Sequence, residues 1–132
     1  MKLVTINPPE LASPSGYAHG VSVEGAGKLL FLGGQVGWDA RGQMESGFAA
    51  QFARALDNLL ATVREAGGEA TSIVQLRIYV LDRHEYASAR KELGRMWRER
   101  FGRHYPAIAL VQVAALLEEG ALVEIEGMAV IA

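Results

Sequence analysis

Two glutamates near the end of the chain are the residues whose type and spacing could do chemistry. Glu124 and Glu126 lie two residues apart in the run 122–131, which is mostly apolar and reads as a β-strand. Side chains two apart on a strand point to the same side. A carboxylate in partly apolar surroundings can pass protons to and from a water molecule. The alternative is a solvated pair at the edge of a sheet, and we interpret Glu126 as structural.

Tyr17 and a run of glycines are further candidates for contact with a small molecule. Tyr17 follows a proline-rich loop whose backbone is stiff, because proline fixes φ. Its phenol could orient a substrate heteroatom, or it could pack at a subunit contact with its hydroxyl in water. The run 33–37 lacks the lysine and hydroxyl residue of a phosphate-binding loop. We interpret it as a bend in a strand, with amide groups around Gly34 and Gln35 that could bind a substrate carbonyl.

The basic residues also have two interpretations. Arg90 lies four residues after Tyr86 on a predicted helix, either as a surface charge or as a group that contacts the substrate. Arg77 lies on the non-core face of a predicted strand, where we expect an ion pair at an interface. The three histidines show none of the spacings typical of a metal site, so we expect no metal.

The elements that must position these side chains follow from hydrophobic periodicity. We expect a hairpin from 19–24 and 29–36 through the glycines at 25–27, and strands at 73–81, 107–114 and 122–131. Apolar residues at three- and four-residue steps predict helices from 46 or 47 to 66 and from 82 to about 101. This order predicts an α+β domain in which two helices pack on one face of one mixed sheet.

The other face of that sheet should also be apolar. Two of the strands carry apolar side chains on both sides, so that Leu29 and Phe31 oppose Leu30 and Leu32, and Ala109 and Val111 oppose Ile108 and Leu110. Two helices can cover only one face. Because a large exposed apolar face is normally an interface, we expect a homo-oligomer.

Composition limits the protein class. The 132 residues suit a single domain spanning 1–132, and 13 basic against 15 acidic residues give a net charge of −2. That charge gives no electrostatic footprint for nucleic acid or anionic lipid. Cysteine is absent, which excludes disulfides and thiolate chemistry. No run is long and apolar enough for a membrane span. We therefore expect a soluble, cytoplasmic protein that binds neither nucleic acid nor membrane.

Several motifs, in this order along the chain, resemble the Rid family, also called YjgF-like. They are GYAHG at 16–20, GGQVGWD at 33–39, the helix with Gln51 and Ala55–Asn58, YVLD at 79–82, YPA at 105–107 and VEIEGMAV at 123–130. The resemblance implies a chorismate-mutase-like α+β fold assembled as a homotrimer, with three clefts between subunits. It also implies hydrolysis of reactive enamines and imines, such as 2-aminoacrylate, to a 2-keto acid and ammonia without a metal or cofactor.

Within this resemblance, two residues match the family's cleft and one departs from it. Tyr17 matches the cleft tyrosine, and Glu124 matches the glutamate that holds the hydrolytic water. In the deaminases the residue two after the proline is an arginine, which binds the substrate carboxylate in a bidentate pair. Here that residue is Ile108, which cannot donate a hydrogen bond. The carboxylate clamp is then lost unless another basic residue reaches the cleft, and the candidates are Arg77, Arg90, Arg103 and His104.

We therefore expect hydrolysis of a small reactive imine, enamine or related planar metabolite in an intersubunit cleft, and not of 2-iminopropanoate. Glu124 and Tyr17 are the expected catalytic residues, with substrate contacts at Ile108, Gly34, Gln35 and Arg90. The alternative is a non-catalytic trimer that binds or senses a small metabolite. Ribonuclease activity is disfavoured by the charge balance.

Overall fold

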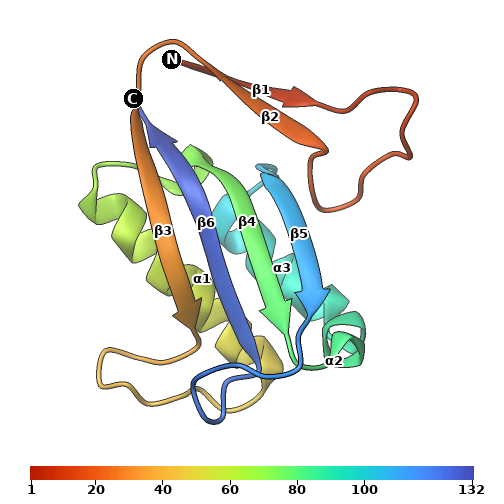
Figure 1. The fold of residues 1–132 in the computed structure, drawn as a ribbon, viewed down its shortest axis with the longest axis vertical. Coiled ribbons are helices and arrows are strands. Elements are labelled where there is room, and N and C mark those ends of the chain that lie inside the picture. Colours follow the sequence, from red (N-terminus) through yellow and green to blue (C-terminus); the bar gives the residue numbers. More distant parts are fainter.

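The computed structural model describes all 132 residues, and its main sheet has four strands in the order β3-β6-β4-β5 (Figure 1). The bounds are Lys28–Val36 for β3, Val123–Ile131 for β6, Ile73–Val80 for β4 and Ala107–Gln112 for β5. The last of these strands in the chain, β6, pairs antiparallel with both β3 and β4, while β4 and β5 pair in parallel. The sheet is therefore mixed, as the sequence predicts.

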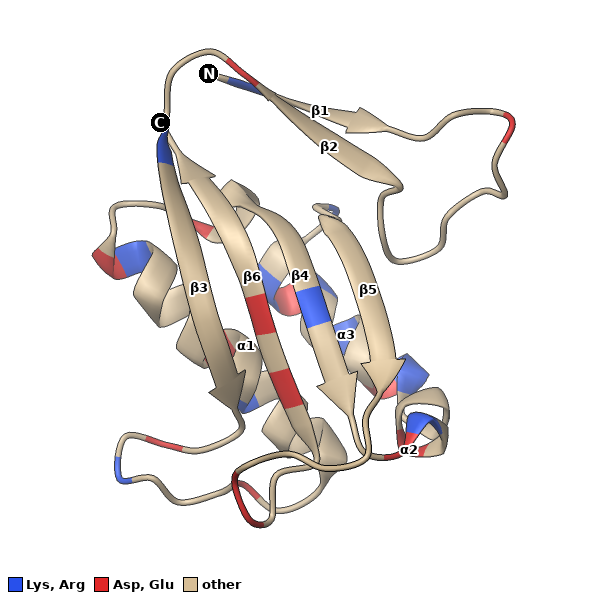
Figure 2. Ribbon diagram, viewed as in Figure 1, with Lys and Arg blue, Asp and Glu red and all other residues tan.

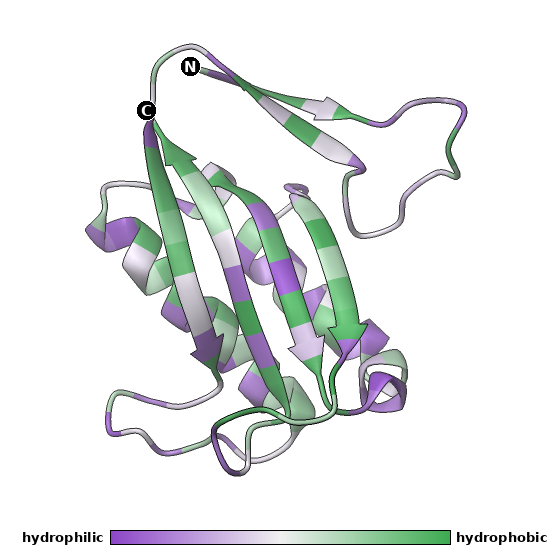
Figure 3. Ribbon diagram, in the orientation of Figure 1, coloured by the Kyte–Doolittle hydropathy of each residue, from purple (hydrophilic) through white to green (hydrophobic).

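Two longer helices, α1 (Phe48–Glu65) and α3 (Arg90–Phe101), cover one face of this sheet (Figure 1). The buried side chains of α1 are those that the periodicity selects, and they join Leu76, Ile78 and Val80 of β4 in one core. Along the strands, polar and apolar residues alternate in places, most clearly in β4 and β6 (Figure 3). An α+β fold with helices on one face is thus confirmed.

The expected helix over 82–101 is wrong in one respect, because it is divided in two. A short helix α2 (Arg83–Ser88) begins after Asp82, whose side chain accepts a hydrogen bond from the His84 amide at 2.8 Å. At Ala89 ψ is 0°, and its amide is shared between the carbonyls of Glu85 and Tyr86. This local change of backbone geometry ends α2 before α3 begins.

The expected hairpin of 19–24 with 29–36 is also wrong. Strand β2 (Gly20–Glu24) pairs instead with β1 (Lys2–Ile6), in a separate two-stranded sheet that projects from the main sheet (Figure 1). The two strands pair along their whole length, from Lys2 opposite Glu24 to Ile6 opposite Gly20. Pairing with β1 hydrogen-bonds one edge of β2 along its whole length, so β2 forms a sheet without β3 as its partner.

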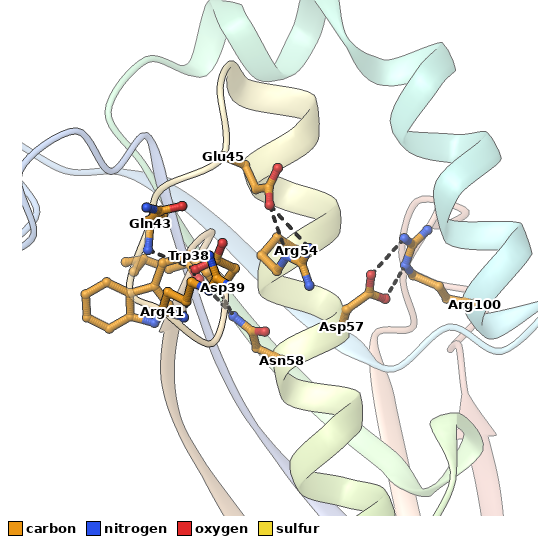
Figure 4. Close-up of polar contacts among 10 residues, drawn as sticks. Trp38, Asp39, Arg41, Gln43, Glu45, Arg54, Asp57, Asn58 and Arg100 are labelled. Atoms are coloured by element: carbon orange, nitrogen blue, oxygen red, sulfur yellow. Dashed lines mark hydrogen bonds and ion pairs between the residues drawn. The ribbon is translucent and has the colours of Figure 1, made fainter.

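Polar contacts hold the loop after β3 against α1 (Figure 4). The Asn58 side-chain amide donates to the carbonyls of Val36 and Trp38 at 3.2 and 2.9 Å. Arg54 pairs with Glu45 at 3.2 Å. These bonds fix the end of β3, which lies beside the glutamates of β6.

A second set of polar contacts joins the helices to each other and to the loop before β6. Arg100 of α3 forms two bonds to the Asp57 carboxylate of α1, at 2.7 and 3.1 Å (Figure 4). The hydrogen bond to Asp57 raises the pKa of Arg100. The buried Gln51 side chain donates to the carbonyls of Glu45 and Gly120 and accepts from the Leu122 amide. No helix combines the length and the apolar character needed to cross a membrane.

Candidate functional site

The sheet face away from the helices carries a polar group that we call the carboxylate cluster: Arg77, Tyr79, Glu124 and Glu126. Both glutamates lie on β6, and Arg77 lies on the neighbouring β4 (Figure 2). The register places Tyr79 opposite Glu124 and Arg77 opposite Glu126. Paired residues of neighbouring strands share a face, so these four side chains lie together on the uncovered side.

Within the carboxylate cluster, Glu126 binds both neighbours on β4. The Tyr79 hydroxyl donates a 2.5 Å hydrogen bond to Glu126 Oε1, and Arg77 Nη1 lies 3.6 Å from the same oxygen. The hydrogen bond to Glu126 is the main cause that raises the pKa of Tyr79, followed by burial and by the Glu126 charge. This agrees with the structural interpretation of Glu126.

The surroundings of Glu124 differ from those of Glu126. Its side chain is half-buried, and the hydrogen bond and ion pair of the carboxylate cluster both go to Glu126. A Cβ at Gly34 would lie 3.0 Å from the Glu124 carboxyl carbon and 3.0 Å from its Oε2. The glycine therefore lets the carboxylate lie against β3, and a Cβ at this position would push it away by a few tenths of an ångström. The predicted bend in the glycine run is confirmed, since the register of β3 against β6 shifts between Leu32 and Gln35.

Gln35 lies beside this bend. It pairs with Ile125, whose side chain is fully buried in the core beneath the helices. A paired residue shares the face of its partner, which places Gln35 on the other side of the sheet from Glu124. The structure thus brings Gly34 to Glu124 and separates Gln35 from it.

A second region, the helix-side cavity, lies between α3, the edge strand β5 and the Tyr17 loop. It has a volume of about 460 Å³. Three predicted site residues line it together: Tyr17, Arg90 and Ile108. The full lining is Ser15, Gly16, Tyr17, Phe52, Ile78, Tyr86, Arg90, Leu93, Gly94, Trp97, Arg98, Tyr105, Ile108 and Leu110.

Tyr17 reaches this cavity because the chain before β2 returns to the main sheet. The Ala18 amide donates to the Pro106 carbonyl at 3.0 Å, and Ala18 forms a parallel bridge with Ala107 at the start of β5. The neighbouring Tyr17 ring packs edge-on against His19, with ring centroids 5.4 Å apart. Tyr17 therefore lies at the outer edge of β5, on the boundary of the helix-side cavity.

Ile108 and Glu124 do not lie together within one chain. Ile108 is paired with Leu76, whose side chain is fully buried in the core, so Ile108 belongs to the helix-covered face. Glu124 lies on the opposite face of β6, and β4 separates it from β5. Apart from Gln35, the predicted site residues thus form two groups: Glu124 with Gly34, and Tyr17 with Arg90 and Ile108.

The candidates for a replacement cation are divided in the same way. Arg77 lies near Glu124 but is paired with Glu126, whereas Arg90 lines the helix-side cavity. The His104 ring is 2.6 Å from the Ile73 carbonyl and therefore has a structural contact. Arg103 lines a shallower hollow beside Tyr17. No three His, Asp or Glu side chains converge to hold a metal ion.

The sequence analysis did not select two other residues of the site. Arg98 lines the helix-side cavity together with Arg90, and Tyr79 donates a hydrogen bond to Glu126. A signal for Arg98 was present, since positions 90, 94 and 98 recur every four residues and so lie along one side of a helix. Tyr79 lies on the same strand face as Arg77 and begins the YVLD motif at 79–82, but neither feature indicated a contact with Glu126.

Comparisons with known proteins agree with this architecture. Residues 8–131 match the family model described as Endoribonuclease L-PSP. A RutC family protein of Haemophilus influenzae is 30% identical over 119 residues, which cover 89% of this chain and 91% of that protein. The human protein named 2-iminobutanoate/2-iminopropanoate deaminase is 30% identical over 116 residues, covering 86% of this chain and 79% of that one.

A solved structure is similar over its whole length. The crystal structure of YyfB, a protein of unknown function of the conserved Rid family from Yersinia pestis, is 32% identical with a TM-score of 0.85. The match covers 99% of this chain and 100% of that one. Fold, motifs and sequence identity converge, and the chain belongs to the Endoribonuclease L-PSP family, which is the Rid or YjgF-like family.

Proposed function

We propose that the protein hydrolyses a reactive imine or enamine in a site shared by two copies of the chain. Glu124 of one copy faces Tyr17 and the helix-side cavity of its neighbour, in a homotrimer of the kind that the family resemblance implies. The observation that carries this proposal is the separation of the two groups of site residues on opposite faces of one sheet. Relatives named as 2-iminobutanoate/2-iminopropanoate deaminases support the reaction class.

The exposed side chains around Glu124 support a covering copy. On the same face, Phe31 is 71% exposed, Leu29 49% and Val111 47%. Large apolar side chains left uncovered in this number are typical of an interface. A second copy packed there would also remove water from around the Glu124 carboxylate, which strengthens its electrostatic interactions with a bound substrate.

The chemistry needs one proton acceptor that later becomes a donor. The Glu124 carboxylate takes a proton from water as the water oxygen bonds to the C=N carbon, and it passes this proton to the substrate nitrogen, which gives a carbinolamine with one hydroxyl and one amino group. Glu124 then takes the hydroxyl proton as the C=O bond forms and delivers it to the nitrogen as the C–N bond breaks, so that the nitrogen leaves as ammonia. Tyr17 orients the substrate by a hydrogen bond to a heteroatom. The sum is imine plus water giving ketone plus ammonia.

Subunit complementation tests both the chemistry and the shared site. Glu124→Gln and Tyr17→Ala are each expected to lower turnover, for Glu124→Gln by about 10²–10⁴-fold. When the two variants are refolded together in equal amounts, random mixed trimers should regain about a quarter of the wild-type activity, since one site in four combines two intact halves. Recovery excludes a site within one chain, and no recovery contradicts the shared site.

Glu126→Gln is the matched control for the Glu124 variant. It lies on the same strand and face, but its carboxylate is held by Tyr79 and Arg77. We expect it to keep most of the activity. If Glu126→Gln loses as much turnover as Glu124→Gln, Glu124 is not the water-handling carboxylate.

A second candidate function is a trimer that binds a metabolite without converting it. Ile108 in place of the clamp arginine, which leaves an apolar side chain on the sheet side of the helix-side cavity, favours this alternative. A ligand that raises the melting temperature but is never consumed would support it. Ammonia release that depends on Glu124 would exclude it.

A further inference from the structure

The helix-side cavity is larger than a three-carbon substrate requires, and its lining combines apolar with polar surface. Its volume of about 460 Å³ lies within the range of roughly 300–1,000 Å³ of pockets that enclose drug-sized ligands. Phe52, Ile78, Leu93 and Leu110 contribute apolar side chains to its lining. Such a surface stabilises a ligand in proportion to the apolar area that the ligand buries.

Two of the aromatic rings that line the helix-side cavity are parallel to each other. The rings of Trp97 and Tyr105, both lining the helix-side cavity, are parallel within 3°, with centroids 6.1 Å apart. The Trp97 nitrogen donates to the His104 carbonyl at 3.1 Å, which fixes the orientation of the indole. Trp97 is 8% exposed and stacks on Phe101 with centroids 4.1 Å apart, so the half-buried Tyr105 is the ring of this pair that a planar group of a ligand can reach.

Two cations line the helix-side cavity without a partner in the chain. Arg90 and Arg98 are one row of α3, eight residues and therefore about 12 Å apart along the helix axis. The other arginines of this helix are paired, Arg95 with Glu92 and Arg100 with Asp57. The two arginines at the helix-side cavity are thus the unpaired ones, and a ligand with a carboxylate would supply the missing anion.

Gly94 leaves a gap between these two arginines. A glycine within a helix costs about 1 kcal/mol relative to alanine, so a gap here has an energetic cost to the fold. A Cβ at position 94 would lie 3.4 Å from Arg98 Nη1. The Arg98 guanidinium therefore folds back along the helix toward the gap, and a larger side chain at position 94 would occupy the space between Arg98 and Arg90.

From these observations we infer the substrate class: 2-imino or 2-enamino acids with a bulky aromatic or branched side chain. The apolar lining receives the side chain, and Arg90 with Arg98 binds the carboxylate that the arginine at position 108 binds in the family's deaminases. This inference rests on the proposed function and names its substrate. It also explains why position 108 holds an isoleucine. The isoleucine extends the apolar surface on the sheet side of the cavity, and the two arginines lie on the helix side.

Binding of 2-keto acids tests the inference without turnover, since these are the stable products of such imines. Isothermal titration of the full-length protein should show phenylpyruvate and 4-methyl-2-oxopentanoate binding at least about tenfold more tightly than pyruvate, because their side chains bury more apolar area. Arg90→Ala and Arg98→Ala should each weaken phenylpyruvate binding by about tenfold. Both side chains are exposed, so neither change threatens the fold.

Two further variants make the test specific. Arg95→Ala removes a charge from the same helix at a residue outside the helix-side cavity and should leave binding unchanged. Gly94→Leu fills the gap and should weaken phenylpyruvate more than pyruvate. Equal affinity for the three keto acids, or an equal loss with Arg95→Ala and Arg90→Ala, overturns the inference.

The outcome separates this inference from the proposed function. If all keto acids bind alike while Glu124→Gln still abolishes ammonia release, the substrate class is wrong and the hydrolase stands. If phenylpyruvate binds selectively through Arg90 and Arg98 while no imine is hydrolysed, the ligand class stands and the proposed function is wrong.

Discussion

On the open face of the sheet, the charged side chains beside Glu124 bind one another or a tyrosine, whereas the two arginines at the helix-side cavity form no ion pair. Tyr79 and Arg77 both contact Glu126, but Arg90 and Arg98 form no ion pair. The first arrangement is complete without a ligand, and it leaves the Glu124 carboxylate outside these bonds. In the function that we propose, a ligand supplies the anion for the second arrangement, and a second copy of the chain brings the two faces together.

The two faces of the sheet also contribute differently to the stability of the fold. A substitution on the buried face is therefore expected to have the largest effect. Leu76 faces the helices and is fully buried, so Leu76→Ala should lower the free energy of unfolding by about 2–5 kcal/mol. Phe31 lies on the open face and is 71% exposed. Phe31→Ser should leave the circular dichroism spectrum unchanged but lower the mass of the assembly. Urea denaturation and light scattering at equal protein concentrations measure the two effects.

A different result would contradict the expectation for each of the two variants. An unchanged unfolding midpoint for Leu76→Ala would show that the core can collapse around the missing side chain. An unchanged assembly mass for Phe31→Ser would show that the open face at β3 is not covered by another copy.

An intermediate effect is expected from adding a cation on the sheet side of the helix-side cavity. Ile108→Arg places a guanidinium on the sheet side, where the family's deaminases have theirs. Ammonia release from 2-iminopropanoate should rise by about tenfold, the value of one charged hydrogen bond. Phenylpyruvate binding should weaken, because the new side chain occupies apolar space. Leu110→Arg is the control, since it adds the same charge to the same lining two residues away, and an equal rise there would contradict a specific role for position 108.

The smallest effect concerns the hydrogen bond within the carboxylate cluster. Because Tyr79 donates to Glu126, its pKa is raised when the chain is folded. The stabilisation is therefore fully present below about pH 10, the usual tyrosine pKa, and is lost as the pH rises through the higher pKa of the folded state. Glu126→Gln should lower the pKa of Tyr79 toward its usual value.

Ultraviolet absorbance of the phenolate measures this titration. Tyr79→Phe identifies the tyrosine concerned, because the latest part of the titration should disappear in that variant. A Glu126→Gln curve that coincides with the wild-type curve would show that the carboxylate does not hold the Tyr79 proton.

The sequence predicts the helix-covered face better than the site. Leu76, Ile78 and Val80 alternate with polar residues, so only one orientation of β4 buries its apolar side chains. The run at 107–111 is apolar throughout, and its pattern cannot tell which face receives Ile108. That choice is made by the parallel register with β4, which depends on contacts distant in sequence.

The two wrong elements have related causes. Strand β2 could pair with β3 through nearby glycines or with β1 across a long loop, and the local sequence favours the shorter connection. The break at Ala89 lies between two segments that both favour a helix. In the first case the pattern identifies the strand but not its partner. In the second it identifies the helical residues but not the point at which the helix divides.

The position of β6 in the sheet has a consequence for how the chain is made. This strand lies between β3 and β4 yet comes last of the sheet's strands from the ribosome. Until it is synthesised, β3 has no neighbour in the main sheet and the core beneath α1 stays open. Folding of the sheet must therefore wait until β6 has been synthesised, and the strand that carries Glu124 is the one that completes the sheet.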